Sequence, residues 1–510
     1  MASSQSKKLT RRDFIKLMGV AGGGLVLSAC APVSAPTPTP APSAIPLPTA
    51  TTAPTSTATP TSTPTATPTA TPTPIPTIQV GDLSVPDPRV TNPELFDLRN
   101  PDAPIPQFVN ALRMAGIEIT AEHVAQGITY EALEDKDGNP FIVAVYNLDP
   151  SLFPEQYRDL AGPIPLMITT RGENGEWKWK KAYLRDIAEI NGIVLRALSG
   201  FGAEPEEEKY REIAFNNFQG ITLSYDWPQV EPERGNYNWE WPDYQFRRAK
   251  EEGIKYYAIH HLLPNSEDGI PTWVDPQNMD LNQIINNHIT SLINHFKRLN
   301  GGSLSGWVLS VVNEAMLPEV RGRRDFFSDR LGEGYIDYAF QLARQLAPEA
   351  ILIYNDSNNH CSQGSTSQDG LSTENTMRIV QRLREKGLID GVGLQMHLSE
   401  GRLPNINDLK NTIRLYQSLG VEVYVTEFDV NLTNIPGSQQ QRLIYQANIV
   451  NQVIKAIIEA GVRNIGVWDI GDSRAWYNYP NADPTLFDDN GNPKISYYFF
   501  LQALFSCRVN

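Results

Sequence analysis

Hydrophobic and polar residues alternate in two distinct patterns along the second half of the chain. Eight short apolar runs, each typical of a buried strand, lie at 193–200, 220–225, 256–262, 307–314, 351–356, 391–397, 423–429 and 464–472. Longer segments between them have apolar residues near helical spacing, as at 281–299, 405–419 and 441–461. Eight strands alternating with helices predict an α/β fold, a (β/α)8 TIM barrel, whose functional groups gather at the carboxyl ends of the strands.

The region before this pattern, residues 78–182, reads differently. Its strand-like runs lie at 141–146, 165–170 and 177–181, with turn signals between them. We predict a small accessory α+β module that precedes a barrel domain at 183–506. Trp177 and Trp179 alternate on the last run, so they share one face, where they either pack within the module or stack on a sugar; packing is the more common role of such a pair.

The first 77 residues are expected to contribute nothing to the folded core. Residues 10–16 read TRRDFIK, a twin-arginine export signal, and the apolar stretch 17–29 is too short to span a bilayer. The segment 1–30 ends in LSAC, which resembles a bacterial lipobox and would place a lipid on Cys30; an ordinary cleaved signal is the alternative. Residues 31–77 are almost entirely Pro, Thr, Ala and Ser, which predicts an extended linker. We therefore expect an extracellular, lipid-anchored protein at the cell surface.

Charge and cysteine content exclude several classes of protein. The net charge of −15 argues against a nucleic-acid partner and fits a neutral substrate. Apart from Cys30 the chain has only Cys361 and Cys507, so it is neither a disulfide scaffold nor a zinc-cluster protein, and we expect these two at opposite ends of the barrel, without a bond between them. His260 and His261 are neighbours on a strand and point to opposite faces. We therefore predict no metal and no cofactor, and a monomer.

Two carboxylates lie at strand ends, where the functional groups of a barrel are expected. Glu314 closes the fourth apolar run, WVLSVVNE, and Glu427 lies near the end of the seventh, VYVTEFD. A single acid at a strand end is often there only because the backbone reaches the surface. Two carboxyl groups that face each other across the mouth of a barrel suit glycoside hydrolysis, in which one donates a proton and the other attacks the anomeric carbon or activates water.

Polar and aromatic residues at the other strand ends are of the types that bind sugars. Amides and acids bond hydroxyl groups and indole rings stack on sugar rings; the candidates are Asn355, Gln395, His397, Asp429, Trp468 and Trp476. An isolated His397 would be read as a core histidine. Between the two acids, it can instead bridge Glu427 and Asp429 and keep Glu427 ionised.

In these motifs residues 183–506 resemble the catalytic domain of glycoside hydrolase family 10, the endo-β-1,4-xylanase family. The similar stretches are VVNEA (311–315), YND (354–356), GVGLQMHL (391–398), VTEFD (425–429), VWDIGDSRAW (467–476) and LFDDNGNPKISYY (486–498). The resemblance implies Glu314 as general acid/base, Glu427 as nucleophile, and Asn313 as the amide that bonds the sugar 2-hydroxyl. It also implies support of Glu427 by Asp429 through His397, and a sugar site formed by Asn355, Gln395, Trp468 and Trp476.

Two stretches depart from the family pattern. After the second strand the chain has TLSYD (222–226), which lacks the family's polar contacts to the distal sugar. In the third strand IHHLLPN (259–265) leaves only His260, after a one-residue shift, as an equivalent of a substrate-binding histidine. The leading expectation is a retaining endo-β-1,4-glycanase whose polysaccharide substrate is xylan. The alternatives are a hydrolase of another β-glycan and a surface glycan-binding protein without turnover.

Overall fold

The computed structural model describes residues 75–508, apart from 173, 203–206, 265–268, 316–324, 362–366 and 478. The predicted export signal, Cys30 and nearly all of the predicted linker lie outside the described residues. Residues from Ile75 onward form one compact unit. Within the part of the chain that is described, no helix has the length and apolar character needed to cross a membrane.

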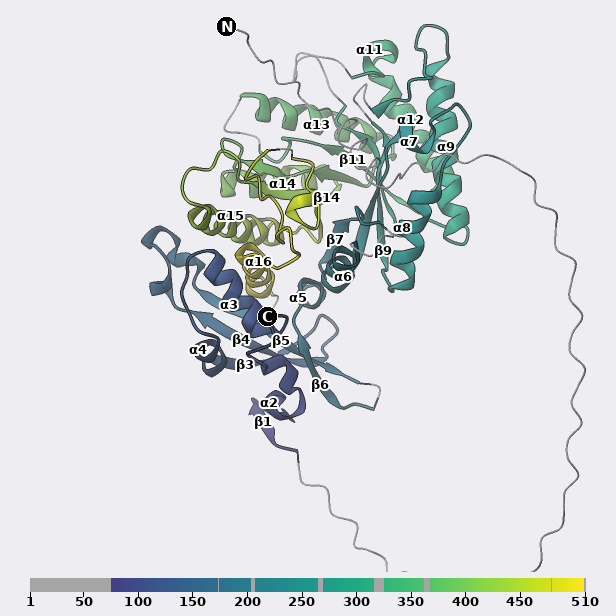
Figure 1. The fold of residues 1–510 in the computed structure, drawn as a ribbon. Coiled ribbons are helices and arrows are strands. Elements are labelled where there is room, and N and C mark those ends of the chain that lie inside the picture. The colour runs from purple at the N-terminus through teal and green to yellow at the C-terminus, as the bar shows by residue number, and fades with distance from the viewer. Residues whose placement is uncertain are drawn as a thin grey trace, which may run out of the picture. The chain divides into compact units, whose positions relative to one another are not determined.

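Eight parallel strands close into a barrel, which confirms the predicted fold class (Figure 1). The strands are β7 (Val194–Leu198), β8 (Gly220–Ser224), β9 (Tyr256–Leu263), β10 (Val308–Asn313), β11 (Ile351–Asp356), β12 (Gly391–Leu394), β14 (Glu422–Asn431) and β15 (Asn464–Val467). Each pairs with the next along the chain, β12 pairs with β14, and β15 pairs with β7 to close the ring. Every predicted strand overlaps one of these eight.

Helices pack around the outside of the barrel (Figure 1). They are α5 (Leu184–Ile190), α6 (Glu208–Asn217), α7 (Trp227–Val230), α8 (Glu240–Glu251), α9 (Leu281–Leu299), α11 (Ser328–Leu331), α12 (Gly334–Leu346), α13 (Ser367–Glu385), α14 (Ile406–Ser418), α15 (Gln439–Glu459) and α16 (Ile495–Ser506), with the 3-10 turn η6 (Asp472–Arg474). The helix α9 shows why they form. The side chain of Asp280 caps its first turn, and its buried residues recur every three or four positions, so one stripe faces the barrel.

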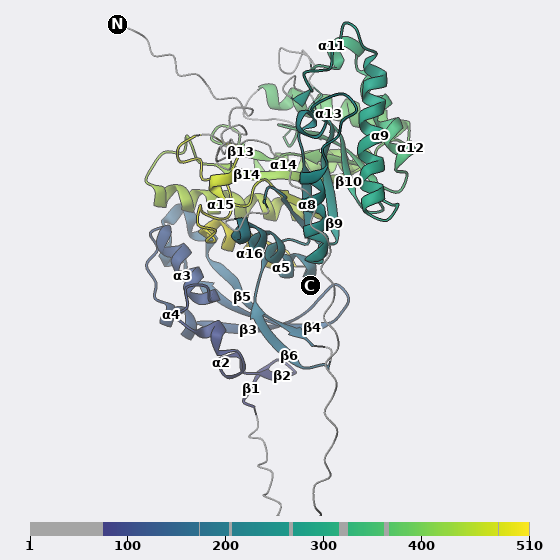
Figure 2. The ribbon, with the colours of Figure 1, turned by 45° about the vertical axis from the view of Figure 1, so that its right-hand side comes forward.

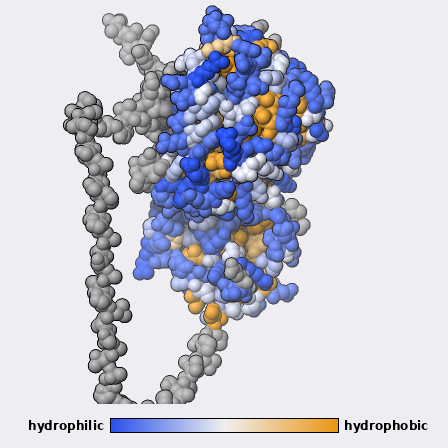
Figure 3. All heavy atoms as spheres, turned by 90° about the vertical axis from the view of Figure 1, so that its right-hand side faces the viewer, coloured by the Kyte–Doolittle hydropathy of each residue, from blue (hydrophilic) through white to orange (hydrophobic). Residues whose placement is uncertain are grey.

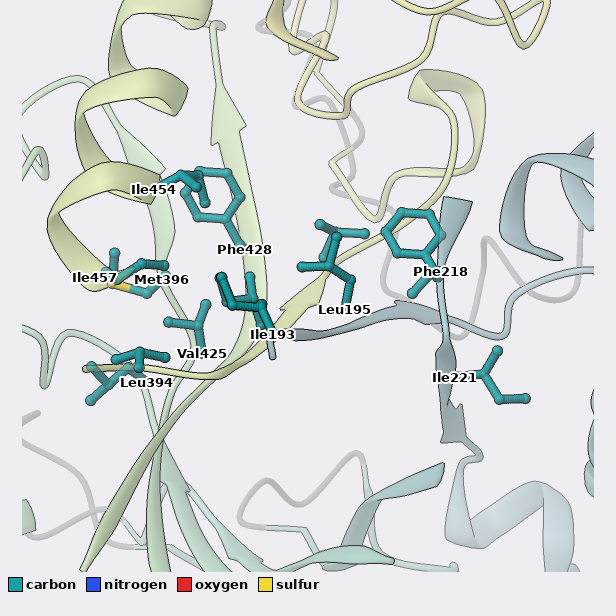
Figure 4. Packing of buried hydrophobic residues seen from close by; sticks show 14 of the residues in the cluster. Ile193, Leu195, Phe218, Ile221, Leu394, Met396, Val425, Phe428, Ile454 and Ile457 are labelled. Atoms are coloured by element: carbon teal, nitrogen blue, oxygen red, sulfur yellow. The ribbon is translucent and has the colours of Figure 1, made fainter. Parts of the chain in front are cut away.

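Hydrophobic side chains of the strands pack against side chains of the surrounding helices. In Figure 4, Ile454 and Ile457 of α15 point toward Phe428 of β14 and Met396, while Leu195 of β7 lies nearby. All of these side chains are buried in one continuous hydrophobic core. The core therefore holds the seventh strand firmly at the position where Glu427 emerges.

The sixth predicted strand is divided in the structure. Residues 391–394 form β12, and a separate short strand β13 (His397–Ser399) pairs with β14 in the register His397 to Asp429. The chain turns between the two strands because Met396 adopts a positive φ of 62°. The seventh strand consequently continues past its predicted end, to Asn431, because β13 gives it a partner there.

The module before the barrel contains three strands in addition to the three strand-like runs of its sequence, and it contains short helices as well. Its antiparallel sheet has the order β3 (Ile128–Glu134), β4 (Pro140–Leu148), β5 (Gly162–Arg171) and β6 (Trp177–Lys181). The remaining elements are a hairpin and short helices: β1 (Thr77–Val80), β2 (Leu83–Pro86), α2 (Pro88–Thr91), η1 (Pro93–Phe96), α3 (Pro104–Met114), α4 (Ala121–Gln126), η2 (Pro150–Leu152) and η3 (Glu155–Leu160).

Trp179 packs inside this module and is not exposed on its surface. Its ring is buried against Val80 and Val85 of the hairpin, and its indole N–H donates to Pro86 O at 2.9 Å. Trp177 packs on the same cluster under the guanidinium of Arg171. One face of the sheet is thus covered by the hairpin, which favours the packing interpretation of the tryptophan pair.

The other face of the sheet packs on the last helix of the barrel, α16 (Figure 2). Eleven of the twelve residues of α16 are buried, so the helix has no solvent-facing side. The ring centroid of its Tyr498 lies 4.9 Å from that of Phe108 of α3. The side chain of its Gln502 donates to Leu160 O at 3.0 Å. Module and barrel therefore share one hydrophobic core.

The two cysteines of the folded region lie at different ends of the barrel. Cys361 is buried shortly after β11, on the side of the carboxyl ends of the strands. Cys507 caps α16, whose Leu504 carbonyl accepts a hydrogen bond from Asn191, just before the first strand begins. On the face that Figure 3 shows, the surface is mostly hydrophilic, with hydrophobic residues in small separate patches.

Candidate active site

Glu314 follows directly on the buried strand β10. Its backbone turns there, with a positive φ of 51°, and its N–H donates to Asn355 O at 2.8 Å, so the turn is tied to the neighbouring strand β11. Its side chain is partly exposed, and its Oε1 accepts a hydrogen bond from Gln395 Nε2 at 2.8 Å. Glu314 is therefore held by Gln395 and remains partly exposed.

Glu427 lies on β14 and is almost completely buried, with 3% exposure. Its Oε1 accepts from Asn355 Nδ2 at 2.7 Å and lies 3.5 Å from His260 Nδ1. Its Oε2 lies 3.0 Å from His397 Nε2. Three side chains from β9, β11 and β13 thus fix the orientation of this carboxylate.

Three amide side chains connect the two carboxylates. Asn313 ends β10, Asn355 lies on β11, and Gln395 follows β12. Asn313 Oδ1 accepts from Asn355 Nδ2 at 2.8 Å and from Gln395 Nε2 at 3.3 Å. The same two amides donate to Glu427 and Glu314 respectively. An unbroken chain of hydrogen bonds therefore links one carboxylate to the other through Asn355, Asn313 and Gln395.

A glycine makes room for this chain. A Cβ added to Gly393 of β12 would lie 2.2 Å from Asn355 Oδ1, which is too close for any real contact. That oxygen accepts from Thr426 Oγ1 at 2.7 Å, which turns the amide nitrogen of Asn355 toward Glu427. The glycine therefore allows the orientation on which the contact to Glu427 depends.

The electrostatics of the site favour an ionised Glu427. Burial raises its pKa, but the charge of His260 and the hydrogen bonds and charge of His397 outweigh burial and leave the pKa below its ordinary value. Burial lowers the pKa of His397, and the adjacent carboxylates of Asp429, at 2.7 Å, and Glu427 reverse this and raise it to about 10. At neutral pH the ring is then an imidazolium that donates to both acids.

Two tryptophans border this network. Trp468 follows β15, is buried, and packs edge-on against His260 and His397, with ring centroids at 4.9 and 6.1 Å. Trp476 is half exposed, and its ring centroid lies 5.3 Å from that of His397. Both side chains predicted from the sequence as walls of a sugar site thus lie beside the histidine that holds Glu427.

Some residues occupy other positions in the site than expected. Asn355, expected among the sugar contacts, is completely buried, and its side chain bonds Glu427, Asn313 and Thr426. His260, whose equivalence was uncertain in the sequence, stands directly beside Glu427. Both differences arise because the barrel wall brings side chains of neighbouring strands into contact beneath the mouth.

One residue of the network was missed in the sequence. The hydroxyl of Tyr477 donates to Asp429 Oδ1 at 3.0 Å. The only sequence signal was its position directly after Trp476, in a stretch without regular secondary structure, where spacing predicts nothing about contacts.

The second strand, β8, is followed by Tyr225 and Asp226. Tyr225 is buried, with its ring stacked on Phe296 at a centroid distance of 6.2 Å. Asp226 begins the short helix α7, and Trp227 donates to Glu231 at 2.8 Å. Among the described residues, no group of three or more His, Cys, Asp and Glu side chains is arranged to hold a metal ion.

Comparison with known proteins agrees with this geometry. The model of glycosyl hydrolase family 10 matches residues 184–503, more than half of the chain. Endo-1,4-beta-xylanase B of Thermotoga neapolitana is 29% identical over 329 residues, which cover 62% of this chain and 89% of the relative. Endo-1,4-beta-xylanase A of Humicola insolens is 32% identical over 291 residues, covering 56% and 73%.

Solved structures show the same fold. The crystal structure of native xylanase 10B from Thermotoga maritima superposes with a TM-score of 0.56 at 27% identity, covering 64% of this chain and 98% of that one. Xylanase 10B from Thermotoga petrophila RKU-1, solved in complex with xylobiose, matches with the same TM-score, identity and coverage. The paired carboxylates, their hydrogen-bonded connection and these matches lead to one conclusion: the chain belongs to glycosyl hydrolase family 10 and is a glycoside hydrolase.

Proposed function

We propose that this protein is a retaining endo-1,4-β-xylanase that hydrolyses internal bonds of xylan. The observation that carries the proposal is the pair of carboxylates in contrasting surroundings: Glu427 is buried and held ionised, whereas Glu314 is partly exposed and accepts a hydrogen bond from the neutral amide of Gln395. A buried, oriented anion suits attack on a carbon atom, and a partly exposed carboxyl group suits proton exchange with a leaving group and then with water. The relatives named as xylanases support xylan as the substrate.

In the first step Glu427 attacks the anomeric carbon while Glu314 gives its proton to the departing glycosidic oxygen. A covalent glycosyl-enzyme forms, and the cleaved end of the polymer leaves. In the second step Glu314, now ionised, takes a proton from water as the water attacks the same carbon and releases Glu427. Asn313 has its oxygen occupied by Asn355 and Gln395, so its amide N–H groups are the ones that can bond a sugar hydroxyl near the reacting carbon.

Another β-glycan is the second candidate substrate, because of the second strand. The sequence TLSYD at this strand end lacks the polar contacts to a distal sugar that the family pattern implies, and the ring of Tyr225 is buried. Reducing ends released from xylan, mixed-linkage glucan and cellulose under identical conditions decide between the substrates. Release from glucan alone would overturn xylan while leaving the mechanism intact, and release from none would favour a binding protein.

The stereochemistry of the first product is the sharpest test of the mechanism. We expect the β-anomer to form first from a β-linked substrate, because two displacements at one carbon restore its configuration. Proton NMR of a fresh digest in heavy water should show the β-anomeric signal early and the α signal only later, through mutarotation. An initial α signal would mean inversion, and Glu427 could then not be the nucleophile.

We also propose that the protein is exported and anchored to the cell surface through a lipid on Cys30. The sequence of the first 30 residues supports this, and a polymer too large to import makes an external enzyme reasonable. In cells that export it, the wild-type chain should partition into the detergent phase of a Triton X-114 extract, and Cys30→Ser should move it into the aqueous phase. A wild-type protein found only in the aqueous phase would contradict the anchor.

A further inference from the structure

The loop between β15 and α16 brings a tyrosine hydroxyl into the network behind Glu427. Tyr477 donates to Asp429 Oδ1, and the other oxygen of Asp429 lies 2.7 Å from His397 Nδ1. His397 in turn contacts Glu427. Four side chains are thus connected in series, with the tyrosine at one end and Glu427 at the other.

The position of this hydroxyl is fixed by the anchors of its loop. Asp469 Oδ2 accepts from the backbone N–H of Trp476 at 3.2 Å, and the ring of Trp476 packs on that of Tyr477 with centroids 4.3 Å apart. Two ion pairs also anchor the loop. Arg474 pairs with Glu207 at 2.5 Å, and Asp472 pairs with Lys494 at 2.9 Å. Both pairs are largely buried, so the loop has little freedom to move the tyrosine away.

We propose that Tyr477 is a positioning residue, whose hydroxyl holds Asp429 as the anchor of His397 and thereby keeps Glu427 ionised and correctly oriented. The inference rests on the proposed function, since it assigns a role within the same site. Tyr477 touches neither carboxylate of the catalytic pair in the contacts described, so it acts through Asp429 and His397 alone.

The surroundings of Asp429 explain why one hydroxyl matters. Burial raises the pKa of the Asp429 carboxyl, and the charge and hydrogen bond of His397 and the donors of Tyr477 and Trp476 counteract it. Burial and the neighbouring Asp429 also raise the pKa of Asp469, to about 7, so a second carboxyl competes for the same positive charge. The other charged or titratable groups that act on this network are His260, Arg402 and Arg474.

Removal of the hydroxyl should shift the pH dependence of catalysis. In Tyr477→Phe, Asp429 loses a donor, so the group Glu427–His397–Asp429 takes up its first proton at a higher pH. The acid limb of kcat/KM on an aryl β-xylobioside should move upward by about one pH unit, and the maximum should fall about tenfold, as expected for loss of one hydrogen bond to a charged group.

The matched control is Tyr479→Phe, since Tyr479 belongs to the same loop but is 60% exposed. This variant should keep the wild-type profile. A second readout needs no turnover: the 15N signals of the His397 ring, assigned by their loss in His397→Asn, should titrate at a higher pH in Tyr477→Phe than in the wild type, because the Asp429 carboxylate without its donor holds the imidazolium more strongly.

An unmoved acid limb together with an unmoved His397 titration in a folded Tyr477→Phe protein would overturn the proposal. If the wild type hydrolyses no aryl β-xylobioside, the proposed substrate fails, while the His397 titration still tests the role of Tyr477.

Discussion

Glu427→Ala is expected to lose hydrolysis of every substrate, whereas Glu314→Ala should lose polymer hydrolysis but retain much of its first-step rate on aryl glycosides with acidic phenols. The difference follows from the two roles. Without the nucleophile no glycosyl-enzyme forms, and a loss on the order of 10⁴–10⁶-fold is expected on polymer and aryl glycoside alike. Without the acid, only leaving groups that need a proton suffer in the first step, by about 10²–10⁴-fold.

Glu314→Ala should also show a burst of phenol followed by slow turnover. The second step needs a base to activate water, so the glycosyl-enzyme accumulates once the base is gone. Azide, a small anion that needs no base, should restore turnover and give a β-glycosyl azide. With Glu427→Ala, azide can enter the space of the missing carboxylate and should give the α-azide in a single displacement.

Glu427→Gln serves as the matched control, because it keeps the size of the side chain and removes only its charge. It should be as inactive as Glu427→Ala while melting at nearly the wild-type temperature. If Glu427→Ala hydrolyses xylan, or if azide yields the α-product with Glu314→Ala, the two roles are wrongly assigned.

Removal of the module is expected to unfold the barrel. If the module were an independent binding domain, the barrel would stay folded without it. A chain that starts at Ala182 would expose one whole side of α16, including the rings of Tyr498 and Phe499 that now pack against Phe108 and Phe153. Each buried aromatic ring of this kind contributes about 1.5–3 kcal/mol, which is a large fraction of the stability of an ordinary protein. We expect this truncated chain to aggregate and to hydrolyse nothing.

The matched control starts at Ile75 and should fold and hydrolyse substrate like the full chain. A point variant tests whether contacts between the module and α16 stabilise the barrel, without removing any part of the chain. Phe108→Ala, in the module, should lower the temperature at which hydrolysis is lost, by an amount that corresponds to about 3–5 kcal/mol, because a cavity opens against α16. A soluble, active protein from Ala182 onward with an unchanged melting temperature would show that the module is an independent domain.

The barrel could be predicted from the sequence because its strands are buried on both faces. Continuous apolar runs such as VLSVV at 308–312 leave little choice of element, and the helices between them have regular apolar spacing. The division of the sixth strand was not predictable in this way. It depends on the positive φ of Met396, a residue type that gives no turn signal.

The candidate site could be predicted only as far as strand ends can be counted. Glu314, Glu427 and His397 follow from their places in the strand order. The buried position of Asn355 and the contact of His260 with Glu427 depend on how neighbouring strands are staggered in the barrel wall, which sequence alone does not give. Tyr477 is harder still, because a loop brings it to Asp429 across 48 residues of sequence.

The burial of α16 on both sides also dictates an order of events during synthesis. The hydrogen bond from Gln502 to Leu160 joins residues 342 positions apart in the chain. A ribosome adding 5–20 residues per second needs roughly 15–70 s to cover that distance. Throughout that time the module has been made but lacks the helix that covers its sheet, so the nascent chain presents an apolar surface until α16 emerges. Chaperone binding to ribosome-held chains should therefore persist until α16 is released.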